Sequence, residues 1–357
     1  MTIFDWKPIL HPIQVISTVF GMSMNSLLIL LILYRSPQNL GVYKYLMVYI
    51  SVFELFFGIL ELMAVPDLWT RGSVFIVLTD PGSTILPKIV LQGTTLLYCG
   101  SFALSLAIFG VQFVYRYQVF RGNSSWLENR LGNILFWMGT PILIAGIWAA
   151  TCGVFLGRNV YVDDLLKNDI LPYCQNVSVD DIGVVCVYFF PKIENDKEVI
   201  NWSSFIGMTI TTIVLLTTES VMLFSGIKCY LAIKKLMGHT NPSQSKNFRQ
   251  IQWQLFCALV SQTFIPILFM QFPISILYIS IFANSSTDFF GILQSLTISF
   301  YLATDALPTI FIIKNFREAV FDFFHNLKSL ICFCSSESPT SGATTASNTL
   351  QIAISSL

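Results

Sequence analysis

The chain of 357 residues is 54% hydrophobic and only 11% charged, whereas soluble domains carry about 25% charged residues. A soluble enzyme or nucleic-acid-binding domain of this length needs far more polar surface, so the composition argues strongly against both classes. Its 20 basic and 20 acidic residues cancel, so no global field attracts nucleic acid or anionic lipid. Eight cysteines in a chain this long are too sparse for a disulfide scaffold.

Seven apolar runs are each long enough to cross a membrane as a helix, which takes about 20 residues. Their uninterrupted length favours helices over the alternating strands of a barrel. Because a backbone in lipid must satisfy its own hydrogen bonds, the sequence predicts an all-α membrane protein, a bundle of seven transmembrane helices. The runs are Ile13–Tyr34, Tyr43–Val65, Ile89–Tyr115, Leu131–Leu156, Ser203–Ile227, Ile251–Phe282 and Phe289–Ile313.

The distribution of charge predicts an N-terminus outside the cell and a cytoplasmic C-terminus. With that orientation the cytoplasmic segments hold thirteen Lys and Arg against four acids, and the outer segments hold seven against twelve. This asymmetry follows the positive-inside rule. The residues before the first run lack a basic segment and a small-residue cleavage site, so we expect that run to be retained as a signal anchor.

Four carboxyl groups lie within the apolar runs, and each is costly when exposed to lipid, so we expect all four to face the bundle interior. Glu54 and Glu61 are seven residues apart and therefore share one face of the second helix. Two interpretations stay open for them: protonated or hydrogen-bonded packing residues, or a polar cluster that changes partners between two states. The other two acids are Glu219 and Asp305.

Polar side chains recur at helical spacing along one face of the third and the seventh helix, starting at their expected outer ends. Such stripes suit hydrogen bonds between helices, each often worth less than about 1 kcal/mol. They also suit a ligand cavity between the outer halves of the helices. Together with neighbouring positions, they make the ligand-binding candidates Gln92, Thr95, Tyr98, Cys99, Gln271, Gln294, Thr297 and Tyr301.

Prolines divide the last two helices. Pro266 and Pro273 interrupt the sixth run, and Pro308 follows Asp305 by three residues in the seventh. Since proline kinks a helix and frees carbonyl groups, both helices have natural hinges. Arg116 ends the third run, where an arginine is commonly a membrane anchor whose charged end reaches water.

The longest outer loop, Gly157–Trp202, is acidic and contains Cys174 and Cys186. Both face the oxidising side in the expected topology, so a disulfide between them is one candidate, and free or differently paired thiols are the alternative. Asn176 and Asn284 lie in glycosylation sequons expected outside the membrane, and they are the candidate sites of modification.

After the seventh run, Asn315–Phe333 alternates charged and apolar residues, a pattern suited to a short amphipathic helix on the membrane surface. Cys332 and Cys334 close this segment and are candidates for palmitoylation or for unmodified thiols. Residues 335–357 contain 11 Ser and Thr among 23 residues, which predicts a disordered cytoplasmic tail. We therefore expect a membrane domain over residues 1–334 and a tail over 335–357.

Segments spread over nearly the whole chain, short of the tail, match a known family of receptors. They are Ser36–Met47, Tyr98–Gly100, Tyr115–Tyr117, Asn201–Gly207, Gln254–Val260, Gln262–Pro266, Asp305–Pro308 and Phe311–Ile313. In these segments the chain resembles the nematode seven-transmembrane chemoreceptors of the Str class, including the related Srj group.

The resemblance implies a G-protein-coupled, olfactory-type receptor in the plasma membrane of ciliated sensory neurons. It implies a small odorant or secreted cue, a heterotrimeric G protein and membrane lipid as partners, without nucleic acid, cofactor or metal. Arg116 is carried over to the arginine position of helix 3, although tyrosines flank it here instead of an acidic partner. The candidates for switching or G-protein coupling are Arg116, Glu219, Asp305, Pro308, Lys234 and Lys235.

Two other classes of function fit the sequence less well than a receptor. A transporter or ligand-gated channel would use the four intramembrane acids as an ion path, but no paired repeats with broken helices are evident in the sequence. An intramembrane enzyme is disfavoured because no catalytic motif is found and all three histidines lie outside the apolar runs. We therefore expect a receptor, not an enzyme, whose ligand favours one of two bundle conformations.

Overall fold

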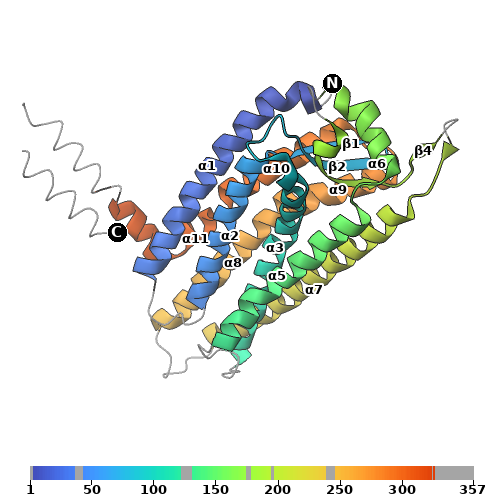
Figure 1. The fold of residues 1–357 in the computed structure, drawn as a ribbon. Coiled ribbons are helices and arrows are strands. Elements are labelled where there is room, and N and C mark those ends of the chain that lie inside the picture. Colours follow the sequence, from blue (N-terminus) through green and yellow to red (C-terminus); the bar gives the residue numbers. More distant parts are fainter. Residues whose placement is uncertain are drawn as a thin grey trace, which may run out of the picture.

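The computed structural model describes residues 3–36, 43–121, 131–173, 178–193, 197–238, 246–323 and 325. Within these residues, seven apolar segments are long enough to cross a membrane, and they pack side by side as one bundle (Figure 1). The seven-helix prediction is confirmed. Five of the segments are single helices: α1 (Ile3–Arg35), α2 (Tyr43–Ala64), α3 (Lys88–Arg121), α5 (Leu131–Phe155) and α7 (Trp202–Gly238).

The sixth and seventh segments are both interrupted, as the prolines predicted. The sixth consists of α8 (Lys246–Pro266), a π-helical turn η5 (Ile267–Gln271) and α9 (Phe272–Phe282). The seventh consists of α10 (Asp288–Thr304) and α11 (Leu307–Ile312), separated by the two residues Asp305 and Ala306. Proline offers no N–H to the preceding turn, so the regular hydrogen-bond ladder is lost at these places.

A three-stranded antiparallel sheet lies at the end of the bundle where α1 begins (Figure 1). We call this the sheet end, and the opposite end of the bundle the far end. The sheet consists of β1 (Asp67–Arg71), β2 (Val74–Thr79) and β3 (Gly183–Tyr188), with β2 in the centre. The prediction of a purely α-helical chain missed this sheet, because its strands lie in segments interpreted as outer loops.

Both faces of this sheet are buried, which explains why β2 and β3 are nearly continuous apolar runs rather than alternating ones. One face packs against a helical cap formed by α6 (Val160–Leu165) and η2 (Leu166–Ile170), through Ile76, Leu78 and Val184. The other face points into the bundle, because successive side chains of a strand point to opposite sides. Its inward side chains are Leu68, Phe75, Val77, Val185 and Val187.

Short elements complete the described fold. The 3₁₀ turns η3 (Leu171–Tyr173) and η4 (Val179–Asp181) precede β3, and a small hairpin of β4 (Lys192–Ile193) and β5 (Lys197–Glu198) follows it. Beyond α11, residues 314–323 are helical, with Phe316 buried and Phe321 exposed, in agreement with the predicted amphipathic helix. Cys332, Cys334 and the predicted tail over 335–357 lie outside the described residues.

Replacing Gly183 with alanine should weaken the docking of β3 on α3. A Cβ atom at this position would lie 2.5 Å from the carbonyl oxygen of Leu91 and from the hydroxyl oxygen of Thr95. The strand would have to move, and overpacking of this kind costs about 1–3 kcal/mol. We expect a lower midpoint of thermal unfolding for the purified protein in detergent.

Gly146→Ala on α5 is the matched control, because its added Cβ atom meets nothing within 4 Å. Equal midpoints for the two variants would contradict close docking of the sheet on α3.

Candidate ligand cavity and the polar network behind it

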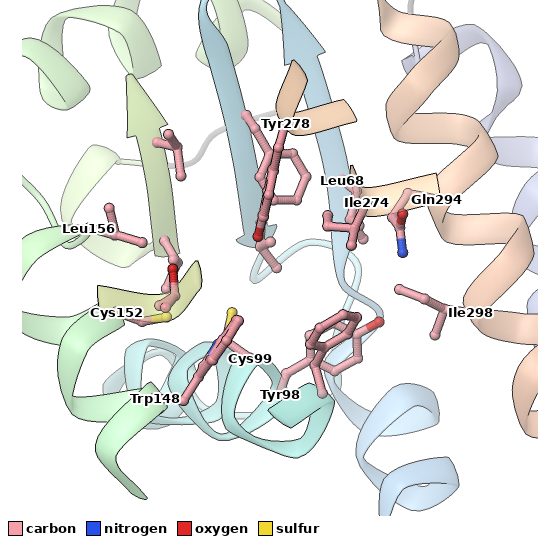
Figure 2. A pocket seen from close by; sticks show the side chains of 16 residues that line it. Leu68, Tyr98, Cys99, Trp148, Cys152, Leu156, Ile274, Tyr278, Gln294 and Ile298 are labelled. Atoms are coloured by element: carbon pink, nitrogen blue, oxygen red, sulfur yellow. The ribbon is translucent and has the colours of Figure 1, made fainter. Parts of the chain in front are cut away.

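A cavity of about 70 Å³ lies inside the bundle, directly against the inward face of the sheet. It has room for several water-sized groups. Figure 2 shows Tyr278 of α9 at one end of this space, with Tyr98 and Trp148 at the other. Helices α3, α5, α7, α9 and α10 supply the remaining wall, and most of the wall is apolar: Phe102, Cys152, Leu156, Ile274 and Ile298 are among its members.

Gln294 is a buried amide in this wall. It enters from α10 between Ile274 and Ile298 (Figure 2), and the residue is 1% exposed. Among the described residues, neither its amide nitrogen nor its amide oxygen has a hydrogen-bond partner. Leaving a buried polar group unpaired costs about 1–3 kcal/mol, so a molecule that satisfies this amide gains a corresponding advantage. Gln294 was among the residues predicted from the sequence.

Two more of the predicted candidates, Tyr98 and Cys99, also line the cavity. Cys99 on α3 and Cys152 on α5 face the same space, and Tyr98 lies at the end opposite Tyr278 (Figure 2). The wall therefore offers two thiols and two tyrosines beside the Gln294 amide.

The other two candidates of helix 3 hold the sheet instead of facing the cavity. The Gln92 amide nitrogen donates to the carbonyl oxygen of Val184 at 2.9 Å, and the Val184 N–H donates to the Gln92 oxygen at 2.8 Å. The hydroxyl oxygens of Thr95 and Thr79 lie 2.9 Å apart. These contacts fix β2 and β3 to α3, and they satisfy polar groups that the sequence had suggested for a ligand.

The sheet is also tied to the first and seventh helical segments. Lys7 near the start of α1 forms an ion pair with Asp67 at 2.6 Å and donates to the Ser83 hydroxyl at 2.7 Å. Burial raises the pKa of the Asp67 carboxyl group, and the Lys7 ammonium group opposes this shift. The Thr70 hydroxyl donates to the carbonyl oxygen of Thr287, just before α10, at 2.5 Å.

The remaining ligand candidates lie elsewhere. The Thr297 hydroxyl donates to the carbonyl oxygen of Gln294 within its own helix at 3.1 Å. The Tyr301 hydroxyl donates to the carboxyl group of Glu54. Gln271 lines a separate groove on the flank of the bundle, together with Glu219. The regular spacing along helix 7 therefore grouped, as ligand candidates, residues whose side chains face different surroundings in the structure.

Several lining residues were missed by the sequence analysis, above all Trp148, Cys152 and Tyr278. They lie in the fourth and sixth helical segments, within continuous apolar runs where nothing distinguishes a cavity wall from a lipid-facing surface. The inward residues of the sheet were missed together with the sheet itself. The ligand-binding candidates taken from the sequence thus included no residue of the fourth helix or of the strands, although both line the cavity.

Behind the cavity, buried polar groups join the second, sixth and seventh helical segments at the break in the seventh. The Gln262 amide nitrogen donates to a carboxyl oxygen of Asp305 at 2.9 Å, and the Thr309 hydroxyl donates to the Gln262 oxygen at 3.0 Å. The Glu54–Tyr301 pair lies about one helical turn before Asp305, at the end of α10. Asp305 and Glu54 each keep one buried oxygen without a partner among the residues that the structure describes, so this network is incomplete as well as buried.

Three of the four intramembrane acids face the interior as expected, since Glu54, Glu61 and Asp305 are at most 4% exposed. The expectation was wrong for Glu219, which is half-buried in the flank groove. The reason lies in α7, whose most apolar stretch is only 17% buried, the smallest share among the seven segments. A polar side chain on this helix has little interior to face.

Arg116 is 3% exposed and is therefore not an anchor whose charge reaches water. Its guanidinium carbon lies 4.0 Å from the centre of the Tyr43 ring, a cation–π contact between α3 and α2. Tyr43 stacks in turn on Tyr115. Within the described part of the chain, two nitrogens of the guanidinium group, Nε and Nη2, have no hydrogen-bond partner.

The other coupling candidates lie near helix ends. Pro308 is the second residue of α11, and Lys234 and Lys235 are exposed near the end of α7.

The modification candidates fall partly within the described residues. Cys186 carries a free thiol, buried in the apolar cluster on the capped face of the sheet, and this burial raises the pKa of the thiol. Its candidate disulfide partner Cys174 and the sequon residue Asn176 lie outside the described residues. Asn284 is exposed, as a glycosylation site must be. Its glycosylation stays a prediction.

Comparison with known proteins gives consistent matches over most of the chain. A family model for serpentine seven-transmembrane GPCR chemoreceptors of the Str type matches residues 10–321. The G-protein coupled receptor str-217 of Caenorhabditis elegans is 29% identical over 308 residues, which are 86% of this chain and 88% of that relative. Serpentine receptor class r-10 of the same organism is 28% identical over 335 residues, 91% of this chain and 94% of that relative.

Among solved structures, the crystal structure of squid rhodopsin is similar, with a TM-score of 0.57 and 11% sequence identity. The match covers 96% of this chain and 90% of that one. At this level of identity the similarity concerns the fold alone.

Tyr301→Phe should destabilise the bundle. The substitution removes the hydroxyl that donates to Glu54, whose other oxygen already lacks a partner, and an unpaired buried acceptor costs about 1–3 kcal/mol. Thermal unfolding of the purified protein in detergent should show a lower midpoint. Tyr230→Phe on the exposed side of α7 is the control, and a comparable loss in that variant would mean that the Glu54 contact is not the cause.

Proposed function

Since the chain belongs to the Str family of serpentine seven-transmembrane GPCR chemoreceptors, we propose that it detects a small chemical cue that binds in the cavity beneath the sheet. The observation that carries this proposal is Gln294, a fully buried amide in the cavity wall with neither its donor nor its acceptor satisfied. Pockets for small ligands are mostly apolar with a few convergent polar groups, and this wall fits that description.

The wall also restricts the chemistry of the cue. Among the described lining residues none carries a formal charge at neutral pH, so an ionic ligand would lose its hydration without gaining a counter-ion. The favoured ligand is neutral and mainly apolar, with one small polar group that pairs with the amide. It is compact, because the space measures about 70 Å³ before any adjustment of the side chains.

We propose that the sheet end is extracellular and the far end cytoplasmic, in line with the positive-inside distribution of charge. Ligand contacts on α9 and α10 would then favour one arrangement of the broken sixth and seventh segments. Arg116, Asp305 and the exposed Lys234 and Lys235 belong to the half of the receptor that engages a heterotrimeric G protein. The cellular site that suits this activity is the plasma membrane of a sensory cilium.

Gln294→Leu should reduce ligand potency at least about tenfold, because the amide contributes a hydrogen bond that leucine cannot make. The measurement is a dose–response curve with a cyclic-nucleotide or calcium readout, normalised to receptor at the cell surface. A panel of small neutral odorants supplies the agonist.

Thr297→Ala is the control on the same helix, since its hydroxyl is bonded to the backbone of its own helix and does not line the cavity. An unchanged potency in Gln294→Leu, or an equal loss in Thr297→Ala, would remove the cavity from the proposed function.

Asp305→Ala and Arg116→Ala should change signalling more than ligand affinity. Both residues lie on the far side of the Glu54–Tyr301 pair from the cavity, and both are buried with unpaired polar atoms. Coupling between linked sites is typically about 1–3 kcal/mol, so the maximal response or the constitutive activity should shift several-fold. If both variants reach the surface and signal normally, these residues serve packing only.

A further inference from the structure

A second hollow, a groove of about 870 Å³, lies on the flank of the bundle between α7 and the η5–α9 segment. Large apolar side chains with high exposure form its rim, among them Leu216, Phe272, Ile279 and Phe282 at 55–70%. In a bilayer this flank meets lipid tails, because seven apolar segments of membrane length span the structure. Whatever occupies the groove therefore comes from the membrane rather than from water.

The groove also holds polar groups that lipid tails cannot satisfy. Glu219 is half-buried in it, and the side-chain oxygen of Gln271 is buried there without a hydrogen-bond partner. Polar groups at membrane depth are costly and tend to mark functional paths. An apolar groove that contains an acceptor and a carboxyl group suits a neutral amphiphile with a hydroxyl or amide group.

The groove and the cavity beneath the sheet share one lining side chain. Tyr278 of α9 is the described residue that lines both hollows. On the cavity side its ring meets Phe75 of β2 edge to face, with the ring centres 6.4 Å apart. Figure 2 shows the tyrosine at one end of the cavity, away from Tyr98 and Trp148. The π-helical turn η5 lies directly before α9, and such turns are common at functional sites.

The route through the sheet is harder to open. All six residues of β2 are buried, and the sheet is held by the reciprocal Gln92–Val184 pair and by the Lys7–Asp67 ion pair. Entry from that side would break several hydrogen bonds at once. At Tyr278, by contrast, the interaction at stake is the ring contact with Phe75.

We propose that ligands reach the cavity from the bilayer, through the groove between α7 and α9, with Tyr278 as the gate. This inference rests on the proposed function for the cavity as the place where the ligand binds. It assigns the receptor to cues that partition into membranes: neutral amphiphiles that concentrate in lipid before they bind. Glu219 and Gln271 would hold the polar group of the ligand on its way to Gln294.

The thiols of Cys99 and Cys152 allow access to be measured without a known ligand, because both line the cavity and not the groove. The full-length protein is placed in phosphatidylcholine nanodiscs and treated with methyl methanethiosulfonate, a small neutral reagent that converts a thiol into a methyl disulfide. Mass spectrometry of the peptides then gives the rate of modification at each of the two cysteines.

Thr212→Trp places a large ring in the groove and should slow this modification about tenfold, equivalent to about 1.4 kcal/mol in the barrier to entry. Ser220→Trp is the matched control, because it adds the same ring to an exposed position of the same helix outside the groove. Tyr278→Ala removes the gate and should speed the reaction. Gln92→Ala loosens the sheet and should leave the rate nearly unchanged.

A faster reaction in Gln92→Ala, with no effect of Thr212→Trp, would place the entrance at the sheet and overturn the proposal. So would the absence of modification in Tyr278→Ala. These modification rates do not depend on signalling. An unchanged ligand potency in Gln294→Leu would refute the proposed function, whereas the modification rates test the entry route separately.

Discussion

The whole sheet end depends on the docking of three strands onto helix α3. The reciprocal hydrogen bonds between the Gln92 side chain and the backbone of Val184 are its centre, and Gly183 permits the approach because any Cβ atom there would meet α3 at 2.5 Å. Once the strands are in place, their inward side chains face the bundle and enclose a space that the helices alone leave open. The candidate ligand cavity is therefore a product of the sheet as much as of the helices.

A different constraint governs the far half of the bundle. Lipid cannot satisfy a polar group, so Glu54, Asp305 and Gln262 must find partners among the helices. They do so at the place where the seventh segment is interrupted, and α2, α8 and α10–α11 are joined there. Because Glu54 and Asp305 each retain an unpaired oxygen, the arrangement leaves free bonding capacity for another set of partners. A buried polar network stabilises the fold when every group in it is paired, and each unpaired group in it lowers that stability.

The sequence predicts the helices well because their cause is local. A segment of about twenty apolar residues in lipid satisfies its backbone hydrogen bonds by forming a helix. Pro266 and Pro308 interrupt the helices in which they lie, because proline has no N–H to donate. The sheet has no local cause of that kind: β2 and β3 pair although Val74 and Tyr188 are more than a hundred positions apart. Their apolar runs are too short to be distinguished from loops when no partner strand is known.

The same difference explains which site residues were predicted. Gln92 and Gln294 look alike in the sequence, since each is a glutamine near the expected outer end of an apolar helix. The strand β3 satisfies the amide of Gln92 completely, whereas no described group reaches the amide of Gln294. Whether a polar residue in a membrane helix serves structure or ligand is decided by its tertiary neighbours, and spacing along one helix contains no information about them.

Helix α9 and helix α10 connect these two halves physically. Tyr278 and Gln294 contact the cavity from segments that begin or end at an interruption, η5 on one side and Asp305–Ala306 on the other. In the proposed function, a ligand in the cavity would contact both segments, and it would shift a conformational equilibrium only if it bound one of their arrangements more tightly than another. A rigid, unbroken helix would transmit such a contact only by moving as a whole. With the breaks placed between the cavity and the Arg116 end, small displacements near the sheet can instead alter how Asp305 and Gln262 are paired.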